Sequence, residues 1–231
     1  MFNVRLSDAR GHANFGWLDS RHTFSFGQYY DPQHMGVSAL RVINDDKVAP
    51  GAGFGTHGHS HMEIISLVTE GAMVHKDSEG NEQLLPAGEF QLMSAGNGIT
   101  HSEFNASTTD PLAFLQIWIQ PNERGGQPGY QQKRFDLTLP QTMVITPDGS
   151  NGTLQIKQDA SLSHINLTAT DKLTMGLVEE RNYYLHVIQG DISVCGHSLS
   201  SGDGIHFSEE SELELIRNSD SETTALLFDL P

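Results

Sequence analysis

The sequence contains a single cysteine, Cys195, among its 231 residues. One cysteine cannot form an internal disulfide and supplies too few thiolates for a multi-cysteine zinc module, so both kinds of scaffold are excluded. A chain of this length buries about 70% of the surface that it exposes when unfolded, so a hydrophobic core can stabilise it without covalent links. The length allows one large domain or two small ones.

Basic residues are also scarce, since 13 Lys and Arg stand against 29 Asp and Glu and give a formal net charge of −16. They do not cluster, whereas a phosphate-binding surface needs clustered positive charge. Direct binding to nucleic acid or to an anionic membrane is therefore disfavoured. An acidic surface is also a common way to keep a protein in solution, so the charge by itself indicates no partner.

Long apolar runs are missing as well. The most apolar segments, such as Ala113–Ile119, are much shorter than the roughly 18–20 residues that span a bilayer. The first ten residues mix both charges and have no apolar stretch like that of a secretory signal. We therefore expect a cytoplasmic protein.

Short strand-like segments are abundant, rich in β-branched or aromatic residues and bounded by Gly, Pro, Asn or Asp. They are Ser38–Asn44, Met62–Glu70, Ala72–Lys76, Glu89–Met93, Leu112–Ile119, Tyr183–Gln189, Asp191–Val194 and Thr224–Asp229. Asp77–Asn81 and Cys195–His197 predict hairpin turns, because glycine supplies the positive φ of tight reversals. No segment sustains apolar residues at helical spacing. The sequence predicts an all-β sandwich or barrel.

The second half of the chain faintly repeats the first. Thr69–Gly71 resembles Ile188–Gly190, and Pro86–Glu89 resembles Ser201–Gly204. Between the copies lies the turn-rich stretch Asn122–Gly129. We therefore predict two similar barrels in tandem, a domain over residues 1–121 and a domain over residues 140–231, with a linker over residues 122–139.

Histidine is in surplus, with twelve residues of which eight precede residue 102. His57 and His59 share one face of a strand because side chains alternate, and His101 and Glu103 repeat this spacing. Two such pairs on facing strands would supply three imidazole nitrogens and one carboxylate. That donor set suits Fe(II), Mn, Ni, Cu or Zn, with positions left open for water, oxygen or substrate.

His61 and Glu63 continue the same alternation, so they are alternatives within the predicted metal site. Glu63 competes with Glu103 for the carboxylate position, and His61 is either a further ligand or a residue outside the site. A single His-x-His pattern is more often a polar strand face than a ligand pair. The independent second pair is what favours a metal site.

These segments resemble a known family. The runs His57–Gly71 and Pro86–Asn105 are similar to the two conserved motifs of the cupins. More narrowly, the chain resembles the pirin-like bicupins, and among them most closely the bacterial pirin-like quercetin 2,3-dioxygenases. The segments that carry this resemblance are Gly16–Asp19, His22–Phe26, Ser38–Asn44, Met93–Gly96 and His101–Glu103. The resemblance is specific from about Gly11 to Pro121 and weak beyond, and it implies two tandem cupin jelly-roll barrels.

The resemblance implies that His57, His59, His101 and Glu103 bind one divalent metal ion per chain, and it favours Glu103 over Glu63. Fe(II) is the expected ion, with Zn, Mn, Ni, Cu and Co as alternatives. The sequence departs from the family pattern at Gly58, where many relatives carry proline, and at His61, where a different residue is expected. Neither departure removes a ligand.

The activity that the resemblance implies is dioxygenation of flavonols such as quercetin, with ring opening and loss of carbon monoxide. Glu103 is the candidate catalytic base for the 3-hydroxyl proton. We expect four apolar residues that flank the ligands to line a slot for a flat ring: Phe54, Met62, Phe90 and Met93. The expected partners are a flavonol-like small molecule and O₂, and the expected state is a monomer.

Two other functions are compatible with the same four metal ligands. One is a non-enzymatic, metal-containing pirin-like regulator that binds protein partners, and the other is a cupin enzyme acting on a different substrate. In the second copy, the positions that correspond to the ligands carry Gly176, Val178, Leu215 and Arg217, none of which supplies a ligand. We therefore expect the second barrel to be a degenerate copy in which three histidines are structural: His186, His197 and His206.

Overall fold

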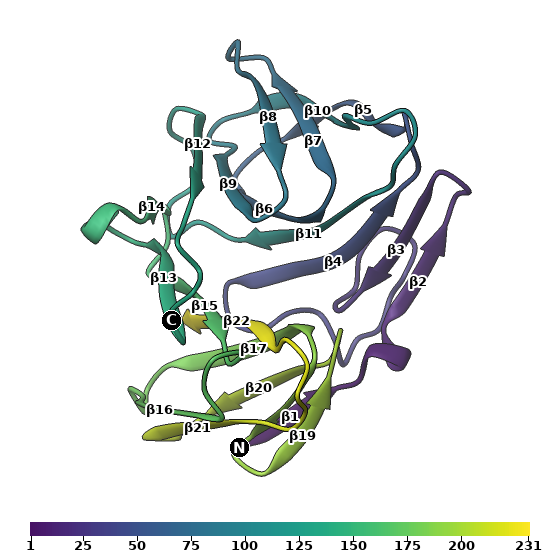
Figure 1. Cartoon of the computed structure of the whole chain (residues 1–231). Coiled ribbons are helices and arrows are strands. Elements are labelled where there is room, and N and C mark those ends of the chain that lie inside the picture. The colour runs from purple at the N-terminus through teal and green to yellow at the C-terminus, as the bar shows by residue number, and fades with distance from the viewer. The chain divides into compact units, whose positions relative to one another are not determined.

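The computed structural model describes all 231 residues as β-strands joined by turns, with only two 3₁₀ helices (Figure 1). The prediction of an all-β fold is confirmed. Neither helix has the length or the apolar character that crossing a membrane requires. Both are three residues long, η1 at Ser7–Ala9 and η2 at Ser150–Gly152.

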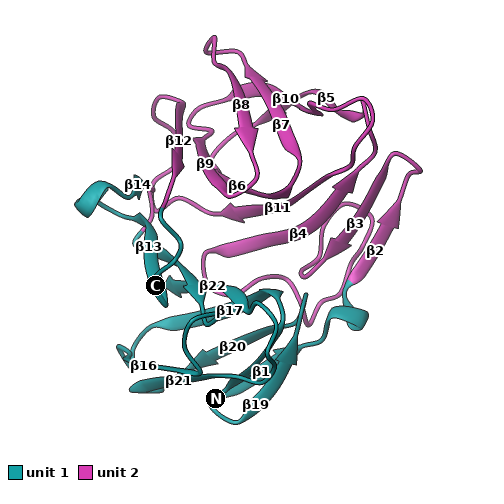
Figure 2. Cartoon of the chain, viewed as in Figure 1, with its two compact units in different colours: residues 1–10, 136–155, 159–231 teal, residues 11–135, 156–158 magenta.

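The chain divides into two compact units, which Figure 2 shows in different colours. Unit 1 comprises residues 1–10, 136–155 and 159–231, and unit 2 comprises residues 11–135 and 156–158. Each unit contains a seven-stranded sheet and a four-stranded sheet. The prediction of two similar β-structures in tandem is therefore confirmed.

Unit 2 contains eleven strands. Its seven-stranded sheet has the order β12-β9-β6-β11-β4-β3-β2, and its four-stranded sheet has the order β5-β10-β7-β8. The strands are β2 (Gly11–Asn14), β3 (Leu18–His22), β4 (Leu40–Val48), β5 (Gly53–His59), β6 (Glu63–Glu70), β7 (Ala72–Asp77), β8 (Glu82–Pro86), β9 (Glu89–Ser94), β10 (Ile99–Asn105), β11 (Leu112–Ile119) and β12 (Gly129–Arg134).

Unit 1 repeats this plan with the orders β1-β20-β17-β22-β15-β13-β14 and β16-β21-β18-β19. The strands are β1 (Phe2–Arg5), β13 (Gln141–Thr146), β14 (Leu154–Gln155), β15 (Ser161–Asn166), β16 (Lys172–Gly176), β17 (Asn182–Gln189), β18 (Asp191–Val194), β19 (His197–Ser200), β20 (Gly204–Ser208), β21 (Glu212–Arg217) and β22 (Thr224–Leu230).

The repeated glycines occupy equivalent turns in the two units. Gly71 joins β6 to β7 and Gly190 joins β17 to β18, with φ of 76° and 83°. Gly88 and Gly202 precede β9 and β20, each with φ of 83°. These angles lie in the left-handed region that favours glycine, which explains why the repeat is visible in the sequence chiefly at glycines.

The two compact units differ from the domain bounds expected from the sequence. The first ten residues belong to unit 1, because β1 pairs with β20 through four residue pairs from Phe2↔Phe207 to Arg5↔Gly204. The predicted linker contains strand β12, which forms an edge of the unit 2 sheet beside β9. Residues 156–158 also join unit 2, where the Lys157 backbone is hydrogen-bonded to Asn122 and to the Glu63 carboxylate.

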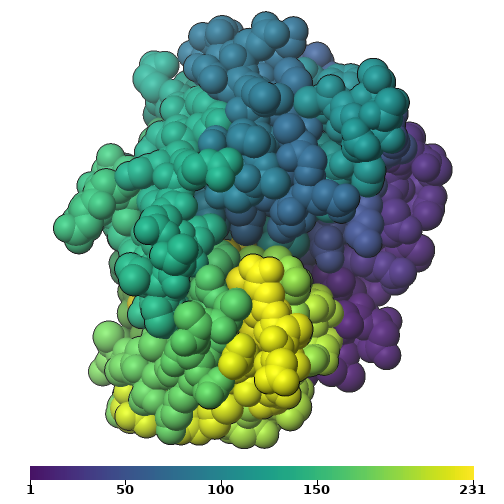
Figure 3. All heavy atoms as spheres, in the orientation of Figure 1, coloured from purple at the N-terminus to yellow at the C-terminus, as the bar shows by residue number.

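The core of unit 2 lies between its two sheets. Phe114 of β11, Val68 of β6 and Val48 of β4 pack there with Met73 of β7 and Leu85 of β8. Central strands with many consecutive apolar residues, such as β11, are buried along nearly their whole length. In the space-filling view the β7–β8 hairpin, blue at the top, forms a continuous surface with its neighbours (Figure 3). The four-stranded sheet of this sandwich contains β5 and β10, the two strands that carry the candidate ligands.

Candidate metal centre

The pairing of β10 with β5 brings the two predicted ligand pairs together. His101 lies directly opposite His57 in the antiparallel register, and Glu103 lies opposite Phe54. Two steps along β10 therefore correspond to three along β5, so β5 carries a β-bulge between Phe54 and His57. Bulges of this kind redirect side chains and are frequent beside functional sites. Here the bulge places Phe54 and His57 on the face that carries the cluster.

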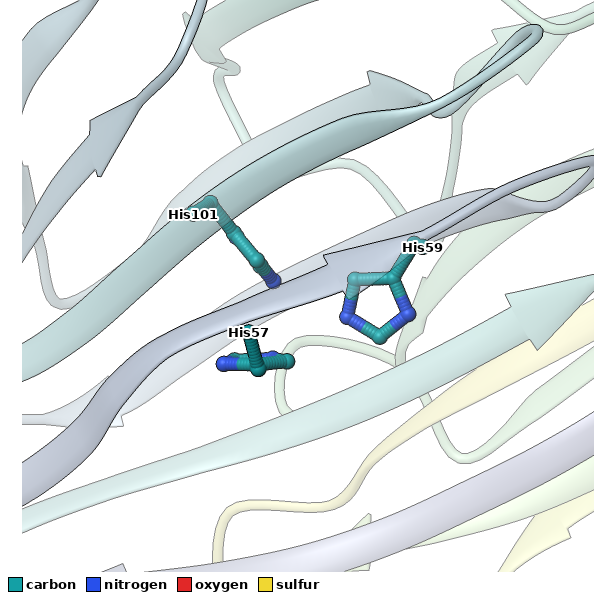
Figure 4. A group of neighbouring side chains, drawn as sticks. All are labelled: His57, His59 and His101. Atoms are coloured by element: carbon teal, nitrogen blue, oxygen red, sulfur yellow. The ribbon is translucent and has the colours of Figure 1, made fainter.

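Three imidazoles converge at this point. Figure 4 shows His57 and His59 extending from β5 and His101 from the neighbouring strand β10. The ring centroids are 4.8 Å apart for His57 and His59, 4.5 Å for His57 and His101, and 4.9 Å for His59 and His101. One nitrogen of each ring lies within 4.8 Å of the others. Three imidazole nitrogens at this spacing can bind one divalent ion after small rotations of the side chains.

The protonation states of the cluster suit metal binding. The Nδ1 of His57 lies 2.8 Å from the Gly55 carbonyl oxygen, so in the neutral ring this nitrogen carries the proton and donates, and Nε2 carries the lone pair. Burial, followed by the neighbouring imidazoles, lowers the pKa of His101 to about 3. Burial and then His57 lower the pKa of His59 to about 4. His59 and His101 are therefore neutral at physiological pH, which is the state that binds metal.

Glu103 lies beside the cluster but belongs to a second group of side chains. Its carboxyl group comes within 4.8 Å of nitrogens of His75 and His101, and it is not grouped with His57 and His59. The side chain is 2% exposed. Burial and the nearby Asp46 carboxyl raise the pKa of Glu103 to about 8. A buried carboxyl with this pKa can hold or release a proton near neutral pH.

His75 is a residue of the site that the sequence analysis missed. It lies on β7 opposite Glu103 and is fully buried, with its ring centroid 5.2 Å from that of His101. Its Nε2 pairs with Asp77 at 3.1 Å, and its Nδ1 has no hydrogen-bond partner. The available signal was His75 in the predicted strand Ala72–Lys76, two residues before Asp77 at the start of the predicted turn. The approach of β7 to β10 was not visible in the sequence.

The two alternative ligands lie outside both groups. His61 has a φ of 54°, and its Nδ1 accepts a hydrogen bond from the Gly125 backbone N–H at 3.1 Å. The Glu63 carboxylate accepts hydrogen bonds from the Ser94 hydroxyl at 2.8 Å and from the Lys157 backbone N–H at 3.2 Å. Both side chains are therefore hydrogen-bonded to other parts of unit 2 and belong to neither group of candidate ligands.

A cavity of about 700 Å³ adjoins the cluster within unit 2. His57 and His59 line it, together with aromatic residues from both sheets and from the segment between β3 and β4. Trp118 lies edge-on to Phe26 at 5.4 Å and to His59 at 5.0 Å between ring centroids. The volume lies in the range of small-molecule sites.

The expected slot for a flat ring is correct at one of its four residues. Phe54 lines the cavity, but Met62, Phe90 and Met93 do not. Phe90 and Met93 are fully buried on β9, and Met62 packs against the small core formed around Met93. The walls come instead from Trp118 and the residues around Phe26, which lie far from the histidines in the sequence.

In unit 1, the strands equivalent to β5 and β10 are β16 and β21. They direct apolar side chains into a hydrophobic core: Leu173, Met175, Leu213 and Leu215. The histidines expected to be structural have different surroundings. His206 contacts the Asn182 side-chain oxygen at 3.2 Å, His186 is buried and His197 is exposed.

Comparison with known proteins agrees with this geometry. The Pirin family profile matches residues 3–119, and the profile of the quercetinase C-terminal cupin domain matches residues 143–230. The chain belongs to the pirin family. The resemblance inferred from the sequence is therefore confirmed, as is the cupin architecture.

Individual relatives of this pirin cover all or nearly all of its length. A quercetin 2,3-dioxygenase of Escherichia coli strain K12 is 48% identical over 231 residues, which is 100% of this chain and 99% of that protein. A pirin-like protein of Caulobacter vibrioides is 39% identical over 96% of this chain and 97% of its own length. The crystal structure of the Escherichia coli bacterial pirin YhhW in complex with nickel(II) is 46% identical, covers 100% of this chain and 99% of its own, and superposes with a TM-score of 0.96.

Proposed function

We propose that this pirin is a metal-dependent dioxygenase that opens flavonols such as quercetin. The observation that carries the proposal is the cluster of His57, His59 and His101 beside a cavity of about 700 Å³ with aromatic walls. The proposal is supported by a relative named quercetin 2,3-dioxygenase that matches the whole chain at 48% identity. A related bacterial pirin has been crystallised in complex with nickel(II).

The residues fit a divalent metal ion. Both ring nitrogens of His101 are buried and lack a hydrogen-bond partner, as do both carboxyl oxygens of Glu103. Buried polar atoms without partners are rare in folded proteins and point to a bound species. We propose His57, His59, His101 and Glu103 as ligands of one ion, Fe(II) first, with Zn, Mn, Ni, Cu and Co as alternatives. When bound, the ion acidifies the flavonol 3-hydroxyl and provides a path for electrons between substrate and O₂.

The side chains of the site have separate tasks in this proposal. The buried Glu103 carboxylate, whose two oxygens have no hydrogen-bond partner in the protein, accepts the 3-hydroxyl proton. Phe54 and Trp118 hold the flat rings by edge and face contacts and keep water away from the reacting carbon atoms. Since the substrate is a small aromatic molecule and the co-substrate is O₂, neither step requires nucleic acid, a membrane or a second copy of the chain. A monomeric, cytoplasmic enzyme is part of the same proposal.

The experiment is loss of the quercetin absorbance band in air, measured with metal-loaded protein, with chelator-treated protein and with the His101→Ala variant. The expected result is oxygen-dependent bleaching by the loaded protein alone. Asp110→Ala is the matched control, because Asp110 lies in a surface turn with Ser107 and Thr109 and should leave bleaching unchanged.

Failure to bleach quercetin after loading with each candidate metal would contradict the proposal. That result would favour a cupin enzyme with another substrate or a regulator that binds protein partners.

A further inference from the structure

A row of polar side chains crosses the inner face of the seven-stranded sheet of unit 2. Directly opposed residues in adjacent antiparallel strands share a face. The register places such residues side by side from β3 to β12, in the order His22, Asn44, Gln116, Ser66, Gln91 and Gln132. All but the last are buried. A row of this kind inside a sandwich is costly wherever its polar atoms lack hydrogen-bond partners.

Asp46 extends this polar face by one step along β4. It lies two residues beyond Asn44 on the same side of the strand and opposite Ser20 of β3. The side chain is 2% exposed, and together with Asn44 and Gln116 it lines the cavity that His57 and His59 also line. The cavity therefore joins a metal-binding side on the small sheet to a hydrogen-bonding side on the large sheet.

The polar atoms on this side are mainly acceptors. Ser20 donates a hydrogen bond to the Asp46 carboxyl, while Oδ1 of Asp46 and Oδ1 of Asn44 have no partner. Burial raises the pKa of Asp46 to about 7, with the Asp45 charge adding to the rise, so the carboxyl ionises as the pH rises through neutrality and its ionised form offers both oxygens as acceptors. A ligand that donates hydroxyl protons would satisfy both free oxygens.

The charge of the lining restricts the ligand further. Neither Arg nor Lys lines the cavity, and Asp46 is the acidic residue in the lining. A carboxylate, sulfate or phosphate group placed against Asp46 and Asn44 would meet free acceptors rather than donors. The chemistry matches a neutral aromatic ring that bears hydroxyl groups.

We propose that Asp46, flanked by Asn44 and Gln116, accepts a hydrogen bond from a phenolic hydroxyl of the substrate other than the 3-hydroxyl, and so selects polyhydroxylated flavonols. This inference rests on the proposed function, from which it takes the flavonol substrate class. It adds a specificity-determining residue that none of the cupin motifs contains, because Asp46 lies on the opposite sheet.

The test compares quercetin with 3-hydroxyflavone, which keeps the 3-hydroxyl and the 4-carbonyl but lacks the other hydroxyl groups. Binding to nickel-loaded protein is measured without oxygen, by quenching of the fluorescence of Trp118 in the cavity wall. A hydrogen bond to a buried carboxylate predicts that wild-type protein binds quercetin about 10–100-fold more tightly than 3-hydroxyflavone. The preference should fall partly in Asp46→Asn and to within about threefold in Asp46→Ala, because the acceptor is first weakened and then removed.

Two further variants serve as a matched control and as an alternative in case Asp46→Ala does not fold. Asp45→Ala removes the neighbouring carboxyl from the other face of β4 and should keep the wild-type preference. Gln116→Met keeps the side-chain length and removes hydrogen bonding, so it should reduce the preference even if Asp46→Ala fails to fold. Circular dichroism and metal content establish that each variant is folded.

The outcomes separate the inference from the proposed function. Equal preference in wild-type protein and Asp46→Ala, or no binding of either flavonol, would overturn the role of Asp46. Selective binding that depends on Asp46, with no loss of quercetin in air, would support this site and reject the dioxygenase. Loss of quercetin in air, with a binding preference that is the same in wild-type protein and in Asp46→Ala, would support the dioxygenase and reject the role of Asp46.

Discussion

Replacing Asp46 with Asn should make unit 2 more stable, although the residue lies in the cavity wall. Burial raises the pKa of Asp46 from 3.8 to about 7. The folded state therefore keeps the Asp46 proton up to about pH 7, whereas the unfolded chain loses it above about pH 4. The unfolded state binds fewer protons in this window, so the free energy of unfolding falls as pH rises through it. Asparagine does not ionise and removes this cost.

The size of the effect follows from the shift. One pKa unit corresponds to about 1.4 kcal/mol, so the expected gain is about 4 kcal/mol at pH 8 and about 2 kcal/mol at pH 5. For a chain of this size each kcal/mol moves the melting temperature by about 2–4 °C. The Asp46→Asn variant should therefore melt about 10 °C above wild-type protein at pH 8, with about half that gain at pH 5.

The assay is thermal unfolding of metal-free protein followed by tryptophan fluorescence. Both tryptophans, Trp17 and Trp118, lie in unit 2, so the signal reports on the unit that contains Asp46. Asp45→Asn is the control for removing a carboxyl from the same strand, and its gain at pH 8 should be much smaller than that of Asp46→Asn, because the Asp45 charge contributes less than burial to the raised pKa of Asp46. A gain of equal size at both pH values, or a loss of stability at pH 8, would refute the reasoning from burial.

Three further results are expected. His101→Ala should lower the metal content from one ion per chain to background while the far-ultraviolet circular dichroism stays unchanged; a full metal complement would contradict its role. Glu63→Ala should keep the metal and lose about 2–3 kcal/mol of stability, because a hydroxyl and a backbone N–H lose their shared acceptor; metal loss with unchanged stability would reverse that assignment. Gly190→Ala should lower the free energy of unfolding in urea by more than about 2 kcal/mol, since its Cβ would overlap the Glu222 carbonyl oxygen. Gly196 also has a positive φ but has open space around it, so Gly196→Ala should cost about 1 kcal/mol. Equal costs would show that the backbone conformation alone determines the loss of stability.

Much of the fold could be predicted because strands and turns are marked by residues that are neighbours in the sequence. The segments Leu112–Ile119 and Asp191–Val194 coincide with β11 and β18, since dense apolar or β-branched runs end there at turn residues. The turn at Cys195 and Gly196 was also predictable, and both residues have positive φ as a tight hairpin requires.

The remaining features depend on pairing between distant parts of the chain. Phe2–Arg5 carries no signal that it will pair with β20 about 200 residues later. The predicted cluster of His57, His59 and His101 rests on local alternation and was found, whereas His75 enters the site because β7 lies beside β10. Asp46 was missed for the same reason, because an acidic residue in a strand gives no indication of a cavity between two sheets.

The account's central claim is that one metal ion held by the histidine cluster supports oxygen-dependent opening of a flavonol. The most direct test titrates metal-free protein with Fe(II) under anaerobic conditions and then measures quercetin loss and O₂ consumption together after admission of air. The account predicts that both rates rise in parallel and stop rising at one ion per chain, with one O₂ consumed for each quercetin. Quercetin loss that proceeds without the metal, or that continues to rise beyond one ion per chain, would contradict it.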